Sequence, residues 1–141
     1  YLYLSMAAYL DSLGLHGFSH WMRRQDAEER THAMRFFDYI VESGGRVLLG
    51  AIDAPPAEWE GLIETFEHAL AHEKMVTGLI NGLVKLAEEE GDESTREFLQ
   101  WYVREQEEEE ESAEKNVREI RAAGGSREAL AELDARMAAR E

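Results

Sequence analysis

Residues 45–56 read GRVLLGAIDAPP, and this stretch carries no helical pattern although long helical patterns flank it on both sides. Fully extended, about a dozen residues reach roughly 40 Å at ~3.3 Å per residue. A helix of about 28 residues is roughly 42 Å long at ~1.5 Å per residue. The stretch can therefore run back along a bundle and make its flanking helices parallel, which predicts a four-helix bundle with one long crossover. The alternative is a surface loop in an up-down-up-down bundle.

Helical patterns fill the rest of the chain. It is rich in Ala, Leu, Glu and Arg, and its two prolines are adjacent at Pro55-Pro56. Glycines mark the breaks, and Ser126 after Gly124-Gly125 is placed as a helix N-cap. Short connections at 13–17 and 91–92 predict antiparallel pairs. We expect one all-α domain over 1–141, with helices at 1–13, 17–44, 57–90, 93–123 and 126–139.

Composition excludes several classes of protein. The chain has 141 residues, a net charge of −15 and no cysteine. The charge argues against a nucleic-acid partner and disfavours an anionic membrane, and the lack of cysteine excludes disulfides, zinc fingers and thiolate nucleophiles. No apolar run approaches the roughly 18 residues of a membrane span. We expect an acidic cytoplasmic protein; its first helix starts in the middle of an amphipathic pattern at Tyr1, which predicts a truncated beginning.

Polar residues interrupt the apolar stripes of three expected helices near mid-length. A buried carboxylate without a partner costs several kcal/mol. The nearest basic residues, Arg30, Lys74 and Arg104, project to other faces, so a divalent cation is the natural compensating charge. The interrupting residues are Gln25, Glu29 and His32 in the second helix, Glu73 in the third, and Gln106 and Glu109 in the fourth.

The spacing of Glu29 and His32 makes this pattern more specific. It is the Glu-x-x-His spacing of carboxylate-bridged di-iron sites in helical bundles. Alone, a glutamate on a stripe is more often a boundary residue, and a lone buried histidine is more often a hydrogen-bonded core residue. Together, carboxylates with one imidazole suit Fe²⁺ or Mn²⁺, with Zn²⁺ as a surrogate.

Neighbouring residues extend this candidate site. Most of the run Glu107–Glu111 is expected to be a solvated acidic face. Trp101 and Tyr102 are expected to be core aromatics, with a radical relay as the alternative. Tyr3 lies near the level of the site on the first helix, as an electron donor or a core residue. A second carboxylate patch is expected from Glu28, Glu105 and Glu108.

The chain resembles the non-haem ferritins of bacteria and archaea along essentially its whole length, and in particular the archaeal members. The archaeal likeness rests on Gly44-Gly-Arg-Val47 and Pro55-Pro56. The other segments that carry the resemblance are Tyr1-Leu-Tyr-Leu-Ser-Met6, Glu28-Glu-Arg-Thr-His32, Phe36-Phe-Asp-Tyr39, His72-Glu73 and Phe98-Leu-Gln-Trp-Tyr-Val-Arg-Glu-Gln106.

This resemblance implies a ferritin-like four-helix bundle with a short fifth helix, and iron storage with ferroxidase activity. Glu29 would bridge two irons, His32 would bind the first, and Glu73 and Glu109 would bind the second beside Gln106. A third iron position would use Glu28, Glu105 and Glu108 with help from Glu109, and Tyr3 matches a tyrosine near the centre. The family's first-helix glutamate ligand would fall about four residues before Tyr1.

The resemblance also implies assembly and cofactors. The shell would usually contain 24 subunits, and Fe²⁺ would be oxidised by O₂ or peroxide to a stored ferric mineral. Haem is not expected, because Arg30 stands where haem-binding relatives have a Met. Two alternatives remain: a di-iron or di-manganese oxidoreductase that detoxifies peroxide without storage, and a structural helical module whose polar core residues are hydrogen-bonded.

Overall fold

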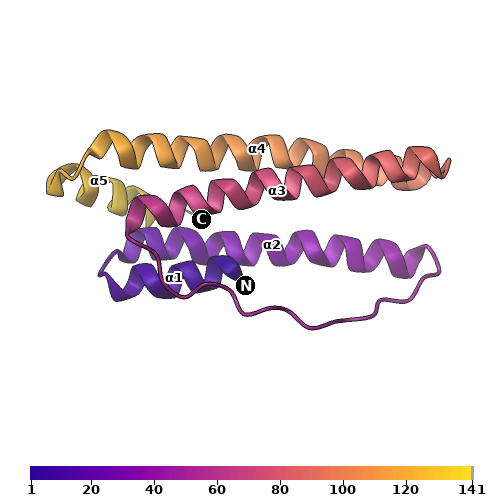
Figure 1. Ribbon diagram of the computed structural model, residues 1–141, viewed down its shortest axis with the longest axis horizontal. Coiled ribbons are helices and arrows are strands. Elements are labelled where there is room, and N and C mark those ends of the chain that lie inside the picture. Colours follow the sequence, from indigo (N-terminus) through magenta and orange to yellow (C-terminus); the bar gives the residue numbers. More distant parts are fainter. Residues whose placement is uncertain (141) are drawn as a thin grey trace. The chain divides into compact units, whose positions relative to one another are not determined.

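The computed structural model describes residues 1–140, which form five helices and no strand. The chain divides into two compact units, Tyr1–Trp59 with the residues from Ser126 onward, and Glu60–Gly125. Each unit is described separately below, and Figure 1 gives the helix labels. The helices are α1 (Leu2–Ser12), α2 (His16–Glu42), α3 (Leu62–Glu89), α4 (Glu93–Ala123) and α5 (Arg127–Met137).

In the first unit, α1 and α2 form an antiparallel hairpin. The amino group of Tyr1 lies 3.3 Å from the Asp26 carboxylate, so the start of α1 lies beside the middle of α2. Helix α1 ends at Ser12, one residue before its expected end, and Leu13 is 49% exposed. The buried face of α1 consists of Tyr3, Met6, Ala7 and Leu10.

The segment after α2 returns along this hairpin, as Figure 1 shows. It leaves at the C-terminal end of α2, where Gly44 adopts a positive φ of 81°. Further along, the Ser5 hydroxyl donates to the Pro56 carbonyl at 2.6 Å. The Tyr9 hydroxyl donates to the Trp59 carbonyl, also at 2.6 Å. Because α1 lies along the N-terminal half of α2, the segment spans the length of α2, which confirms the long crossover.

The start of α3 was predicted too early. The helix begins at Leu62 rather than near residue 57, so Trp59 lies in the crossover instead of on the apolar stripe of α3. Its indole ring packs 5.3 Å from the Tyr9 ring. At the start of α3, the Glu64 carboxylate accepts a hydrogen bond from the Glu60 amide, which satisfies one N–H at this helix end. The prediction was wrong because Trp59 is apolar and has the spacing of the apolar stripe of α3, although it lies before the helix.

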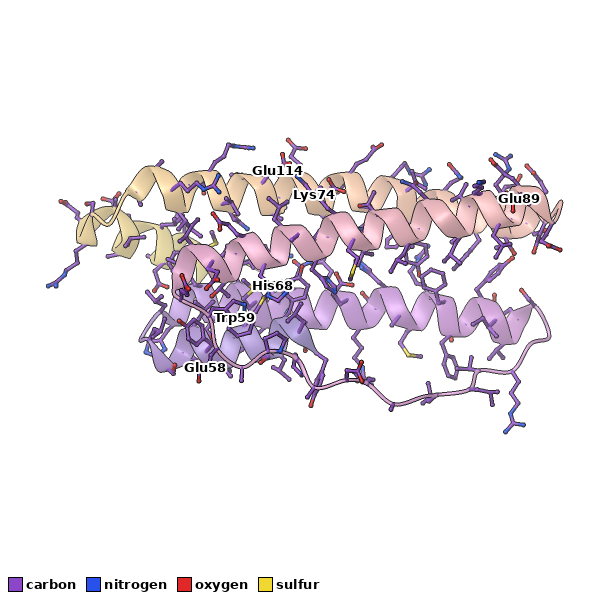
Figure 2. The ribbon with its side chains drawn as sticks, viewed as in Figure 1. Glu58, Trp59, His68, Lys74, Glu89 and Glu114 are labelled. Atoms are coloured by element: carbon purple, nitrogen blue, oxygen red, sulfur yellow. The ribbon has the colours of Figure 1, made fainter. Side chains whose placement is uncertain are left out.

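In the second unit, α3 and α4 form the other antiparallel hairpin. Lys74 on α3 forms an ion pair of 3.0 Å with Glu114 on α4 (Figure 2). Nearer the other end, Arg121 on α4 lies 2.6 Å from Glu67 on α3. The side chain of Asp92 caps α4 by accepting the Thr95 amide at 3.0 Å. Helix α4 begins one residue after this cap and ends at Ala123, which confirms its predicted start and end.

Helix α5 packs against the start of α2 within the first unit. Ser126 caps α5 as predicted, accepting the Ala129 amide at 3.3 Å. The Asp134 carboxylate accepts the Phe18 amide at 2.9 Å and so caps α2 from outside that helix. A Cβ on Gly17 would lie 1.8 Å from the Asp134 carbonyl oxygen, so only glycine permits this approach. Among residues 1–140, no helix has both the length and the apolar character needed to cross a membrane.

Candidate metal centre

The α3–α4 hairpin buries three of the predicted donor residues. Glu73 is 1% exposed, Gln106 4% and Glu109 7%. The Gln106 amide nitrogen donates to a Glu73 carboxylate oxygen and to the Glu73 carbonyl oxygen, each at 3.2 Å. A carboxylate so far from water is unfavourable unless other groups compensate its charge, and the Gln106 amide is one such group. The hairpin is thus a dry, oxygen-rich surface that favours a cation.

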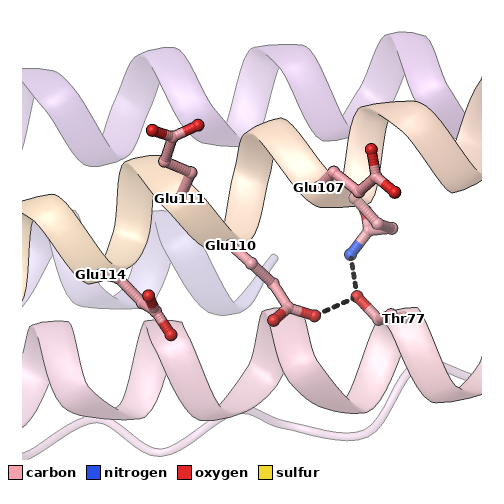
Figure 3. A pocket seen from close by; sticks show the side chains of 6 residues that line it. Thr77, Glu107, Glu110, Glu111 and Glu114 are labelled. Atoms are coloured by element: carbon pink, nitrogen blue, oxygen red, sulfur yellow. Dashed lines mark hydrogen bonds between the residues drawn. The ribbon is translucent and has the colours of Figure 1, made fainter.

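Thr77 links this buried group to the acidic outside of the hairpin. Its hydroxyl accepts from the Gln106 amide at 3.3 Å and donates to Glu110 at 2.5 Å (Figure 3). Thr77 was not among the residues predicted for the site. Because Thr77 lies one helical turn after Glu73, its spacing was a signal in the sequence that could have placed it beside the site. An open pocket of about 410 Å³ surrounds it, lined by Thr77, Gln106, Glu107, Glu110, Glu111 and Glu114.

Charge on this acidic face is partly balanced by Lys74. The hydrogen bond from Lys74 lowers the pKa of Glu114, and the attraction between the two charges acts in the same direction. Lys74 therefore faces Glu114 and not the buried Glu73, as expected. Arg30 and Arg104 are exposed, which also agrees with the predicted faces.

The first unit presents a second group of donors on α2. His32 is 8% exposed, and its Nδ1 lies 3.5 Å from a carboxylate oxygen of Glu29. The Glu29 side chain keeps 32% of its surface exposed. One turn before His32, Glu28 brings a carboxylate oxygen within 4.8 Å of an imidazole nitrogen of His32. An imidazole and two carboxylates thus lie together over little more than one helical turn.

Arg140 belongs to this group, although the sequence analysis did not identify it. Its guanidinium donates to the Glu28 carboxylate at 2.6 Å and to the Gln25 side-chain oxygen at 2.8 Å. It also lies 4.6 Å from the centre of the Trp21 ring. Because Arg140 is 112 residues from Glu28 in sequence, no local spacing could have indicated the pair.

The remaining predicted residues differ in their surroundings. On α4, Glu105 is half-buried with a carboxylate oxygen within 4.8 Å of one from Glu109, whereas Glu108 is exposed. Tyr3 is 3% exposed. Tyr102 is buried, as expected of a core aromatic, whereas Trp101 is half-buried and packs edge-on against it with ring centres 4.9 Å apart.

Comparisons with known proteins identify relatives of this chain. Residues 1–123 match the family model described as a ferritin-like domain. A bacterial non-heme ferritin of Bacteroides fragilis (strain 638R) is 44% identical over 123 residues, which cover 87% of this chain and 77% of the relative. A bacterial non-heme ferritin of Escherichia coli O6:H1 is 36% identical over 133 residues, covering 94% of this chain and 81% of the relative.

A solved structure matches over the whole chain. It is described as a novel open pore ferritin from the hyperthermophilic archaeon Archaeoglobus fulgidus. It has a TM-score of 0.99 at 51% identity, and the match covers 100% of this chain and 87% of that one. The fold is therefore the all-α ferritin-like four-helix bundle with a short C-terminal helix. Family model, relatives and structure agree, and the chain belongs to the ferritin family.

Proposed function

We propose that this ferritin stores iron by oxidising Fe²⁺ at a di-iron centre and depositing the ferric product inside an oligomeric shell. Iron storage is the function that family membership supports. One observation carries the ferroxidase step: the α3–α4 hairpin buries Glu73 and Glu109 with a hydrogen-bonded amide beside them. Such burial is unfavourable unless a cation joins the carboxylates.

The proposed centre takes donors from both units. Glu29 bridges two irons, His32 binds the first, and Glu73 and Glu109 bind the second, with Gln106 beside the pair. Oxygen and imidazole donors without thiolate suit Fe²⁺, and Zn²⁺ or Mn²⁺ can stand in for it. The third iron position uses Glu28, Glu105, Glu108 and Glu109, and Tyr3 is placed near the centre.

The protein's part in the chemistry is to hold two Fe²⁺ ions side by side. Each ion gives up one electron, and O₂ takes both with two protons from water to form hydrogen peroxide. With peroxide as oxidant, the same two electrons give two hydroxide ions. Gln106 orients the Glu73 carboxylate through its 3.2 Å hydrogen bond, so the donor geometry is set before iron arrives.

Assembly and delivery follow from the same proposal. A closed shell of 24 identical subunits would enclose the mineral, and dioxygen or peroxide would enter from solution. The charge of −15 on each chain attracts Fe²⁺ toward the acidic surfaces. We place the protein in the cytoplasm, with no nucleic acid, membrane or haem as a partner.

Iron loading tests this function directly. The protein is given Fe²⁺ in air in small additions, and the iron retained is counted after separation by size. Storage predicts on the order of hundreds of irons per assembly, whereas a di-iron oxidoreductase without storage retains about two per chain. Retention of about two per chain would contradict storage, and retention of none would contradict the metal centre as well.

A further inference from the structure

The guanidinium of Arg140 is held in a fixed position against α2. Three partners surround it within the first unit: the Trp21 ring at 4.6 Å, the Gln25 oxygen at 2.8 Å and the Glu28 carboxylate at 2.6 Å. Its side chain keeps only 24% of its surface exposed, against 40% for Glu28. Stacking on an aromatic face combined with a charge-assisted hydrogen bond is a geometry that lysine reproduces poorly.

The backbone at the end of the chain is also tied to α2. His20 Nε2 lies 2.8 Å from the Arg140 carbonyl oxygen. Within α5, Asp134 caps α2 through the Phe18 amide, and α5 approaches Gly17 too closely for any side chain. Arg140 is therefore fixed by several contacts, and its pairing with Glu28 follows from the docking of α5.

A guanidinium and a metal ion compete for the same carboxylate. Glu28 is the only donor of α2 that we assign to the third iron position, and one of its oxygens is already bonded to Arg140. A metal ion there must either displace the guanidinium or bind next to its positive charge, and both weaken cation binding. On α2, the guanidinium of Arg140 contacts Trp21, Gln25 and Glu28. In the proposed function, Glu29 and His32 serve the first two irons.

We propose that Arg140 is a positioning residue that holds Glu28 in an ion pair and thereby weakens the third iron position relative to the other two. This inference rests on the proposed function, because it concerns a residue of the same centre. It makes the third position a place of brief occupancy, from which iron moves on. The docking of α5 then controls how long iron stays there.

Calorimetric titration with Zn²⁺ tests this proposal, because Zn²⁺ is redox-inactive and reports binding without oxidation. In Arg140→Gln, the weakest of the bound ions is expected to bind roughly threefold to tenfold more tightly, with the other ions unchanged. Arg140→Lys keeps the charge but loses the stacked fork, and is expected to fall between. Arg127→Gln is the control, since it removes the same charge from an exposed position on α5.

A double-mutant cycle separates competition from a purely structural role. In a Glu28→Gln background, Arg140→Gln is expected to change no zinc affinity, because the carboxylate for which the two cations compete is gone. An equal effect of Arg140→Gln with and without Glu28, or no effect in either, would overturn the proposal. Wild-type protein that binds no Zn²⁺ would instead overturn the proposed metal centre together with it.

Discussion

The candidate metal donors of the two units differ in their exposure to solvent and in their partners. In the α3–α4 hairpin, Glu73 is almost fully buried and is held by a neutral amide. On α2, Glu28 and Glu29 keep 40% and 32% of their side-chain surface exposed, and the first of them is paired with a cation of the protein. One unit thus carries a buried, preformed set of oxygens, and the other carries partly exposed carboxylates, one of which is held by Arg140.

The donors of the two units are therefore expected to affect different properties of the site. Burial of the α3–α4 carboxylates destabilises the metal-free protein, whereas solvent and Arg140 compensate the charge of the α2 carboxylates. We expect the first group to control how strongly metal stabilises the protein. The second group is expected to control which ions stay and which move on.

Removal of the His32 imidazole is expected to have the largest effect on activity. His32→Ala is expected to slow Fe²⁺ oxidation by more than about 100-fold, because the α2 group loses its only nitrogen donor. The rate of ferric product formation after mixing with oxygenated buffer measures the effect. His16→Ala is the control, since His16 is exposed and its side chain contacts Asp11 at the turn. Wild-type rates in His32→Ala, with helicity intact, would refute the site assignment.

Neutralising the buried carboxylate tests its cost. Glu73→Gln is expected to raise the free energy of unfolding of the metal-free protein by about 1–2 kcal/mol, because an amide of the same shape is cheaper to bury. The same variant is expected to lose the stabilisation that Zn²⁺ gives the wild type. Urea unfolding with and without Zn²⁺ measures both.

Glu28→Gln is the matched comparison in the other unit. It is expected to lower the free energy of unfolding by no more than about 1 kcal/mol, since its half-exposed pair with Arg140 contributes little. If Glu73→Gln were also destabilising, the buried carboxylate would not carry the burial cost that we assign to it.

The threonine that connects the buried amide to the acidic face is expected to have a smaller effect. Thr77→Val removes the acceptor for Gln106 and the donor to Glu110, and should cost about 1 kcal/mol in unfolding free energy. Thr31→Val, at an exposed position of α2 with only a local bond to the Glu28 carbonyl, should cost less. Equal losses in the two variants would argue against a hydrogen-bonded network around Glu73.

Acid sensitivity outside the site gives the smallest effect. Hydrogen bonds from the Thr95 side chain and then its amide lower the pKa of Asp92 below 3.8. A lowered carboxyl pKa means that this cap stabilises α4 above pH 3.8 and that the contribution is lost as the pH falls through the folded-state value. Asp92→Asn caps without titrating, so its thermal midpoint should fall less steeply in acid. Parallel midpoint curves for the two proteins would contradict this.

Local signals made α4 predictable, whereas distant partners made other features unpredictable. Asp92 and Gly124 define the ends of α4, and its apolar stripe contains Gln106 and Glu109 at positions that are indeed buried. The start of α3 was misplaced because Trp59 fits a helical stripe but packs on Tyr9 in the crossover. Arg140 could not be found, since its pairing depends on how α5 returns to α2.

The most direct measurement is a crystal structure of the protein soaked with Fe²⁺ without oxygen. We predict two ions joined by Glu29, one bound by His32 and the other by Glu73 and Glu109. No density beside the imidazole of His32, with these carboxylates turned toward bulk water, would contradict the account.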